Sequence, residues 1–169
     1  MQPDPSNGTG VVTGIYITDG AGQPMRGVDE VAAVAGAGLD ADRYLRGTGF
    51  YSARPREDGG REVTFIAEEA VAAAADEAGV VFEPHESRRN IVTRGIDLNE
   101  LVGLRVRVGS AAFDVVDLCT PCAHLEEVTG KPVMRALLNR GGLRTRIHQP
   151  GVVQVGDVLD VAGPIPDAG

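Results

Sequence analysis

Cysteine is scarce in this sequence, and long apolar runs are missing from it. Only two of the 169 residues are cysteines, too few for a disulfide-rich secreted scaffold. No apolar stretch approaches the roughly 20 residues that a membrane-spanning helix requires. Residues 1–10 have no basic residue and no apolar segment, so we expect a disordered leader there rather than a signal peptide. These features predict a cytoplasmic protein that does not bind a membrane.

Positive charge is also in deficit. The chain has 16 basic and 24 acidic residues and a formal net charge of −8, which argues against nucleic acid as a partner. Residues 86–148 differ from the rest, because they hold ten arginine or lysine residues against seven acidic ones. Since the planar arginine fork binds phosphate oxygens in pairs, this segment favours a small anionic ligand. Solvated arginines paired with nearby acids are the alternative.

Short strands dominate the pattern of apolar residues. Strands are expected at 10–18, 62–67, 89–93, 103–109, 111–118, 144–148 and 152–161, the last range holding two strands around a Gly-Asp turn. Helices are expected at 68–78, 123–128 and 132–138, while residues 25–39 suit either a helix or a strand. Strands at short intervals predict a mainly β barrel or sandwich in one domain, residues 11–162, with a tail at 163–169.

Cys119 and Cys122 form a C-x-x-C motif that has three interpretations. It can be a dithiol redox pair, half of a zinc site completed by two of the three histidines, or one reactive cysteine beside one buried as a small apolar residue. Cys122 follows Pro121 and begins a predicted helix, the position where a helix dipole favours a thiolate. We therefore favour Cys122 as the reactive residue.

Three further groups of residues are candidates for the same site. His124 lies two positions after Cys122 and is either a proton donor or a surface residue. Arg88, Arg89 and Asn90 open a predicted strand. The stretch from Arg140 through Gly141 and Gly142 to Arg144 is either an anion-binding turn, with backbone N–H groups directed at the anion, or simply the end of a helix.

The order of these motifs resembles the MOSC domain, named for the C-terminal domain of molybdenum cofactor sulfurases. The resemblance rests on ESRRNIVTRGIDLNELVGLRVRVG, on the PCxxL of Pro121 to Leu125, and on the later RGGLRTRI and GVVQVGDVL. It extends over about residues 11–161 and is closest to the compact stand-alone bacterial type. The early turn of the family, usually Gly-Asp-Arg-His, reads Ala41-Asp42-Arg43-Tyr44 here, so we assign no cofactor role to that turn.

The resemblance implies a distorted β-barrel with a few short peripheral helices. It also implies a molybdenum–molybdopterin cofactor, with Cys122 as metal ligand and catalytic residue and His124 beside it. The cofactor-binding positions carried over are Arg88, Arg89, Asn90, Arg140, Gly141, Gly142 and Arg144.

The resemblance leaves three functions open. In the first, the protein reduces N-hydroxylated substrates with electrons from a reductase partner. In the second, Cys122 accepts sulfane sulfur as a persulfide from a cysteine desulfurase and delivers it to a metal centre, and pyridoxal phosphate then belongs to that partner. In the third, the protein is a non-catalytic module that binds an anion.

Overall fold

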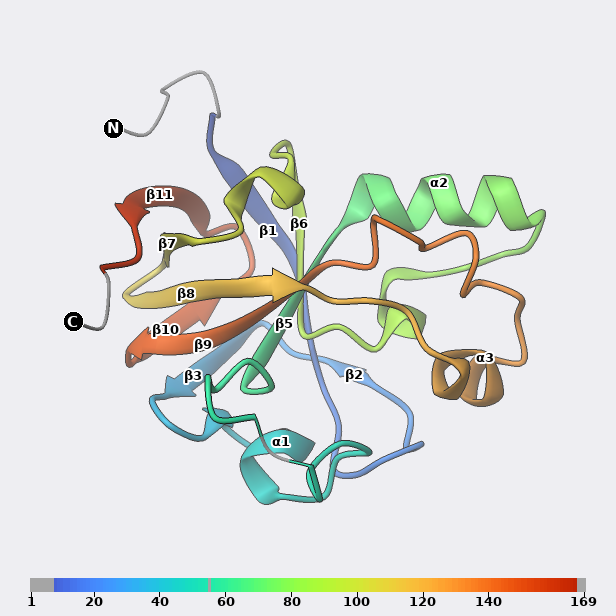
Figure 1. Ribbon diagram of the computed structural model, residues 1–169, viewed down its shortest axis with the longest axis horizontal. Helices are drawn as coiled ribbons and strands as arrows, with labels where there is room; N and C mark the ends of the chain where they lie inside the picture. Colours follow the sequence, from blue (N-terminus) through green and yellow to red (C-terminus); the bar gives the residue numbers. More distant parts are fainter. Residues whose placement is uncertain (1–7, 55, 167–169) are drawn as a thin grey trace.

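The computed structural model describes residues 8–54 and 56–166. Most of the predicted leader and the last three residues of the predicted tail therefore lie outside the described residues. The chain forms a β-barrel with a layer of helices and loops on one side and a small second sheet toward the lower left of the view (Figure 1). The predicted mainly β barrel with short peripheral helices is confirmed. No helix in the described part is long and apolar enough to span a membrane.

Seven strands of the described chain close the barrel. In order around the barrel they are β11 (Val158–Pro164), β7 (Leu104–Val108), β8 (Ala111–Leu118), β9 (Leu143–Gln149), β5 (Val63–Ala67), β6 (Ile91–Arg94) and β1 (Gly10–Ile17). Pairing of Gly10 with Leu159 joins the first strand to the last, so the barrel has no open edge. Only β5 and β6 run parallel among these pairs.

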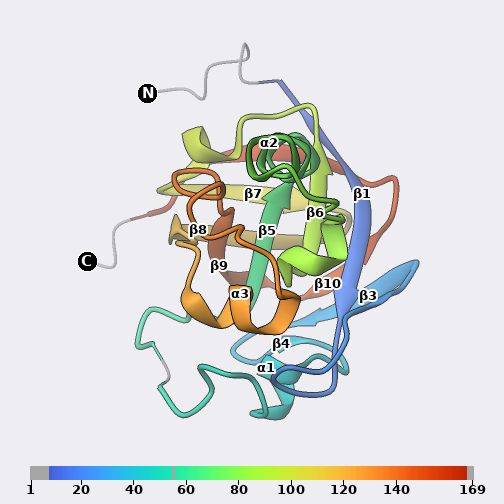
Figure 2. The same cartoon turned by 90° about the vertical axis from the view of Figure 1, so that its right-hand side faces the viewer.

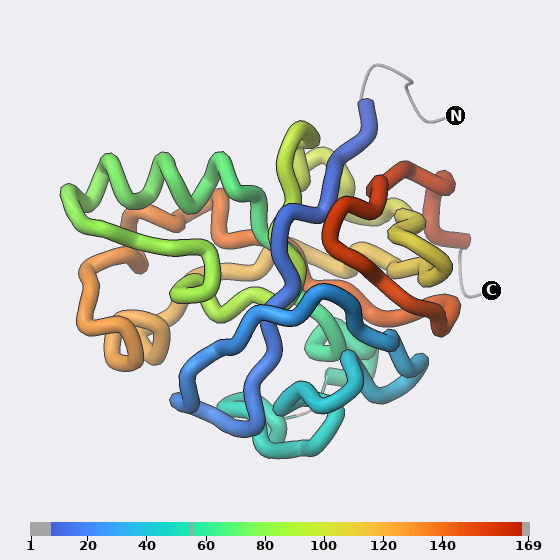
Figure 3. The backbone as a smooth tube through the Cα atoms, turned by 180° about the vertical axis from the view of Figure 1, so that it is seen from behind, coloured from blue at the N-terminus to red at the C-terminus, as the bar shows by residue number. Residues whose placement is uncertain are grey.

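A second, smaller sheet lies beside the barrel. It consists of β10 (Gly151–Gln154), β3 (Glu30–Val34) and β4 (Gly38–Leu39). The short β2 (Arg26–Gly27) pairs antiparallel with the end of β1. The backbone trace in Figure 3 shows the blue N-terminal part of the chain and the red C-terminal part on the same side of the molecule. The ambiguous residues 25–39 thus form strands. In β3, Val31 and Ala33 are buried while their neighbours are exposed, an alternation of period two that a helix cannot satisfy.

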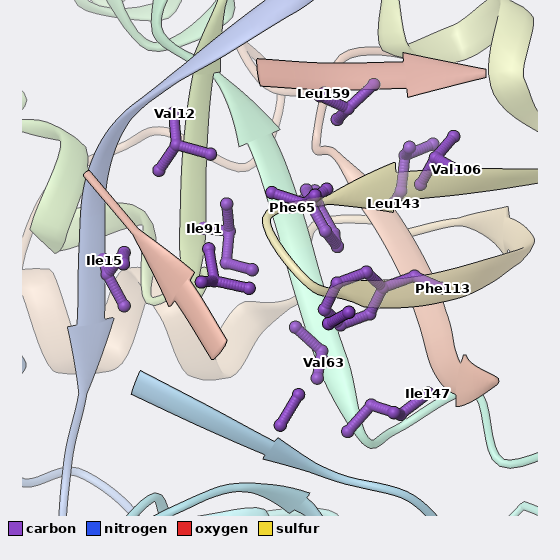
Figure 4. Close-up of a cluster of buried hydrophobic side chains, with 14 of the residues drawn as sticks. Val12, Ile15, Val63, Phe65, Ile91, Val106, Phe113, Leu143, Ile147 and Leu159 are labelled. Carbon is purple, nitrogen blue, oxygen red and sulfur yellow. The ribbon is translucent and has the colours of Figure 1, made fainter. Parts of the chain in front are cut away.

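Large apolar side chains fill the barrel interior. Phe65 and Phe113 meet edge to face with ring centroids 5.3 Å apart (Figure 4). The strands β5 and β6 are buried on both faces, because Ile66 and Val92 point outward into a second apolar cluster. That cluster lies under the helical layer, which explains why these two strands are almost continuously apolar.

The helical layer consists of short elements. They are α1 (Arg43–Arg46), α2 (Glu68–Ala78), α3 (Ala123–Thr129) and the 3₁₀ turns η2 (Pro84–Ser87) and η3 (Leu98–Leu101). In Figure 2, α2 and α3 lie in front of the barrel and α1 lies below it. The predicted range of α2 is correct, since the helix begins after β5 and ends at a left-handed Gly79.

The helix predicted at residues 132–138 does not form. The segment is a series of turns with one helix-like bond, from the Leu137 N–H to the Val133 carbonyl. Val133 and Leu137 are buried in the outer cluster, so the apolar spacing was read correctly. The segment forms shorter-range turn bonds as well, from the Leu138 N–H to the Arg135 carbonyl and from the Arg140 N–H to the Leu137 carbonyl, and it ends at a left-handed Asn139.

Gly142 is expected to be essential for folding, because a Cβ atom there would lie 1.9 Å from the Phe65 carbonyl oxygen and its φ is +100°. We predict that Gly142→Ala lowers the free energy of unfolding by about 3 kcal/mol or more. Gly130→Ala is the matched control, since Gly130 also has a positive φ but nothing within 4 Å, and it should cost only about 1 kcal/mol. Urea unfolding of both variants measures this, and equal losses would contradict the prediction.

Candidate functional site

The candidate site lies on the outer face of the barrel wall. Val63 and Phe65 point into the barrel, so Thr64 between them points outward, and Arg144 of β9 does the same beside the inward Leu143. At this level β8 ends, and the chain makes an excursion over residues 119–142 before it returns as β9. The excursion carries both cysteines.

The two cysteines occupy different environments. Cys122 is partly exposed and is the N-cap residue of α3, whereas Cys119 is buried and its N–H donates to the Gly142 carbonyl at 2.7 Å. Both are free thiols. No group of three or more His, Cys, Asp or Glu side chains that could hold a metal occurs within residues 8–54 and 56–166. The arrangement therefore favours one accessible cysteine over a protein-only zinc site.

Two small adjoining cavities of about 40 and 50 Å³ meet at Cys122. Both are lined by Arg43, Tyr44, Tyr51, Arg88 and Arg89; the first adds Phe50 and His124, and the second adds Arg61, Thr64 and Arg144. No acidic side chain of the described residues lines either one. Five arginines thus contribute to the lining of the two cavities, and the buried Cys119 lines the second cavity together with Cys122.

Arg88 is buried, with an exposed fraction of 7%. Its Nη1 donates to the Gln23 carbonyl at 2.7 Å, while its buried Nη2 has no hydrogen-bond partner among the described residues. Burial, and then the charge of Arg43, lower the pKa of Arg88 to about 10, so the group remains charged at neutral pH. An unsatisfied buried cation that lines a cavity is the donor an anionic ligand requires.

Two other predicted arginines are held by backbone carbonyls. Arg89 Nε donates to the Gly141 carbonyl at 2.8 Å, and Arg144 Nη1 donates to the Leu118 carbonyl at 3.0 Å. Of the five arginines, only Arg43 and Arg144 lie within ion-pair distance of a carboxylate in the described chain. Most of the positive charge at the site is therefore not neutralised.

The turn that departs from the family sequence is part of the site. Ala41 adopts a left-handed φ of +64°, the conformation that the glycine usual in the family favours. The fully buried Asp42 accepts from the N–H groups of Thr18 and Tyr44 and from Arg43. Arg43 Nη2 then donates to the Arg88 carbonyl at 3.0 Å, so this turn orients Arg88.

An aromatic segment covers the cysteine. Phe50 stacks on His124 with ring centroids 3.8 Å apart, and it meets the neighbouring Tyr51 edge to face at 4.8 Å. The guanidinium of Arg61 lies 4.4 Å from the centroid of the Tyr51 ring. Burial, and then the neighbouring Cys122 sulfur, raise the pKa of Tyr51 to about 12, so its hydroxyl stays protonated.

Sequence reasoning missed this cover and the Arg43 turn. A signal was available, because Tyr44, Phe50 and Tyr51 lie within eight residues of a chain with only three tyrosines and four phenylalanines. The contacts themselves are tertiary, since they join residues 43–61 to residues 88 and 122–124.

The structure does not bring all the predicted cofactor residues to the cavities. Asn90 is fully buried behind them, where it bonds to the Thr64 N–H and the Tyr16 carbonyl and so ties three strands together. Arg140 pairs with Glu77 on the border of a separate hollow of about 550 Å³.

The double glycine serves packing and presents carbonyls to the site. A Cβ at Gly141 would lie 2.4 Å from the Cys119 carbonyl oxygen, so glycine lets the cysteine segment approach β9. The Gly141 carbonyl accepts from Arg89, and the Gly142 carbonyl accepts from Cys119. These contacts engage the two carbonyls, and the binding of an anion by the N–H groups of this turn stays a prediction.

Comparison with known proteins identifies the class. The model of the MOSC domain family matches residues 48–160, more than half of the chain, so the chain belongs to the MOSC domain family. The matched range begins after the Ala41–Tyr44 turn. No curated protein matches the chain.

Several solved structures have the same fold. The YuaD protein of Bacillus subtilis has a TM-score of 0.77 at 22% identity, and the match covers 91% of this chain and 96% of that protein. YiiM of Geobacillus stearothermophilus has a TM-score of 0.65 at 16% identity, and the match covers 92% of this chain and 75% of that protein. YiiM of Escherichia coli has a TM-score of 0.64 at 20% identity, and the match covers 93% of this chain and 72% of that protein. At these identities the likeness establishes the fold alone.

His124 is expected to be neutral at pH 7. Burial beneath Phe50, and then the charge of Arg88, lower its pKa from the ordinary value near 6.5. Because the folded state resists protonation, this residue favours folding above about pH 6.5 and loses that contribution as the pH falls through its lowered pKa. An NMR titration, with the signal assigned by its loss in His124→Gln, should show this lower pKa, and a value at or above 6.5 would contradict it.

Removing the aromatic cover should expose the cysteine. We predict that Phe50→Ala increases the rate at which iodoacetamide alkylates Cys122 by several-fold, because access limits thiol reactivity. Peptide mass spectrometry distinguishes Cys122 from the buried Cys119. Val81→Ala is the control, since Val81 is an exposed apolar residue that lines neither cavity. An unchanged rate in Phe50→Ala would show that Phe50 does not restrict access.

Proposed function

We propose that this protein binds a molybdenum–pterin cofactor through the Cys122 sulfur and reduces N-hydroxylated substrates. The observation that carries the proposal is one accessible cysteine in a cavity lined by five arginines, where a buried nitrogen of Arg88 has no partner in the described chain. Family membership supports the same conclusion.

The donor set of the site fits this cofactor. A thiolate is a soft ligand suited to a thiophilic metal, and guanidinium groups suit the phosphate of a pterin. Cys122 would be the metal ligand, and Arg88, Arg89 and Arg144 would bind the anionic part. When bound, the molybdenum centre would supply the electrons for reduction of the N–O bond, themselves delivered by a reductase partner.

The space at the site sets a condition for binding. Cavities of about 40 and 50 Å³ are far smaller than the roughly 300–1000 Å³ typical of cofactor pockets. A third cavity of about 200 Å³ lies on the other side of Tyr44, Tyr51 and Arg61. A pterin would therefore require Phe50 and Tyr51 to move aside, and the two cavities would then merge with the third.

Tyr51 and His124 would donate or accept protons near the reacting group. Tyr51 keeps its hydroxyl proton over the physiological pH range and can donate a hydrogen bond from Oη toward the sulfur or a substrate oxygen. His124 is neutral at pH 7 and can accept or donate one proton in the same cavity.

The proposal predicts that the molybdenum content of the protein depends on the Cys122 sulfur. Protein purified from cells that synthesise molybdopterin should contain molybdenum and pterin, and Cys122→Ser should lose most of the molybdenum while staying folded. Elemental analysis beside pterin fluorescence measures both. Absence of molybdenum from the wild-type protein, or an equal content in Cys122→Ser, would reject the proposal.

The site gives less support to the two other functions. A desulfurase would have to bring its own protein-bound persulfide to Cys122, which lies partly covered by Phe50 and Tyr51. A purely structural Cys122 in an anion-binding module is disfavoured by its place at the junction of both cavities. Intact-mass analysis after incubation with a desulfurase tests the first, and resistance of Cys122 to alkylation would favour the second.

A further inference from the structure

The cavity of about 200 Å³ next to the Cys122 site, here called the side cavity, has two distinct parts. Tyr44, Tyr51 and Arg61 line both the side cavity and the second Cys122 cavity, so they form the wall between the two. Glu62 lines the side cavity and neither of the Cys122 cavities. A ligand in the side cavity can therefore have one end at the wall and the other beside Glu62.

Arg61 is a cation at this wall that the protein does not neutralise. Its guanidinium lies over the Tyr51 ring, and its buried Nε has no hydrogen-bond partner among the described residues. The other arginine of the side cavity, Arg56, is bound by the carboxylates of Asp58 and Asp117. Arg61 is therefore the group at the wall that can donate to an oxygen atom of a ligand.

Glu62 is the acidic residue that lines the side cavity within the described chain. Its Oε1 accepts from the N–H groups of Gly36 at 3.1 Å and Ile147 at 3.2 Å, so the carboxylate is held in position. Its Oε2 accepts no hydrogen bond from the described residues, and burial raises the pKa of the carboxyl group. A positively charged ligand group beside Oε2 would offset that desolvation.

The lining also restricts the size and shape of the ligand. A volume of about 200 Å³ holds roughly seven water molecules at about 30 Å³ each, or one six-membered ring with a short substituent. Gly36, Gly47 and Gly59 leave the space open because they contribute only backbone, and two tyrosines line the wall. Aromatic side chains favour packing against a flat ring.

We propose that the side cavity binds the substrate, and that this substrate is a single-ring N-hydroxylated compound with a protonated amine opposite its N–O group. Arg61 donates to the N–O oxygen at the wall, and the amine donates to Glu62. The assignment rests on the proposed reductase function. The reduction consumes two electrons and two protons and releases the N–O oxygen as water.

The pterin of the proposed function leaves room for this substrate. Arg88, Arg89 and Arg144, which would bind its anionic part, line the second Cys122 cavity and not the side cavity. When the cover moves aside and the cavities merge, the region beside Glu62 is on the side away from these arginines. Glu62 and Arg61 then fix which end of the substrate points toward Cys122.

Calorimetric binding of three compounds to the full chain tests the proposal. They are benzamidoximes that carry an aminomethyl, a hydroxymethyl or a carboxyl group opposite the amidoxime, so they differ in charge but little in size. The aminomethyl compound should bind about tenfold more tightly than the hydroxymethyl compound, the effect of one charge-assisted contact. The carboxyl compound should bind most weakly. In molybdenum-loaded protein the KM values should follow the same order.

Glu62→Gln should abolish the preference for the aminomethyl compound, because glutamine keeps the acceptor oxygen but loses the charge. Glu57→Gln is the matched control, since Glu57 is an exposed acid that does not line the side cavity. Arg61→Met should weaken binding of the hydroxymethyl compound several-fold, whereas Arg135→Met, at an exposed arginine away from this cavity, should not. Circular dichroism shows whether each variant is folded.

A further pair of variants locates the bound compound. Ala37 lines the side cavity, so Ala37→Leu should fill part of it and weaken binding of all three compounds. Ala35 lies nearby in the chain, is exposed and does not line the cavity, so Ala35→Leu should bind them as the wild-type protein does.

The proposal is overturned if no compound binds, if the aminomethyl and hydroxymethyl compounds bind equally, if the carboxyl compound binds best, or if the preference persists in Glu62→Gln. None of these measurements requires molybdenum. Protein that contains molybdenum and reduces the hydroxymethyl compound, yet shows no charge preference, would refute only the substrate assignment. Protein that shows the preference but acquires no molybdenum would refute the reductase and leave the binding site in place.

Discussion

Arg88 is a cation that the fold buries without an acidic partner, and the surrounding residues hold it in that position. Its backbone is left-handed, with a φ of +61°, and its carbonyl is bound by Arg43, which in turn pairs with the buried Asp42. The one buried carboxylate of this network thus neutralises Arg43 and leaves Arg88 uncompensated. Burying a charge in this way is unfavourable, so an anion bound in the cavity recovers free energy that the empty site does not.

The barrel itself could be predicted from the sequence to a large extent. Period-two alternation marks β7, the apolar run after the turn at Gly109 marks β8, and the change to an Ala-rich run after Ala67 marks α2. Residues 132–138 show where such patterns fail. Their apolar spacing matches a helix, but the spacing reports only which residues are buried, and the backbone there forms turns that end at a left-handed Asn139.

The candidate site was predictable only in part, because its members come from separate segments. Residue type and local motif were enough to predict Cys122, Arg88, Arg89 and Arg144 as site residues, and all four line one cavity in the structure. Arg140 lies only four residues from Arg144, yet it lies on the border of another hollow, since β9 begins between them and turns its residues alternately in and out.

Gly141 and Gly142 show a related limit of sequence reasoning. A glycine pair gives the backbone freedom, and sequence alone does not say what the freedom is used for. Here it lets the cysteine segment and β5 approach β9 within distances that any side chain would prevent.

Charge and space act on different properties of a ligand at this site. The arginines attract anions in general, and with charge alone the site could not distinguish a pterin phosphate from an inorganic oxyanion. The Phe50–Tyr51 cover supplies the discrimination, because its position sets the volume next to Cys122. The free energy that holds Phe50 on His124 therefore opposes the entry of any ligand larger than these cavities, because such a ligand has to displace Phe50 before it reaches Cys122.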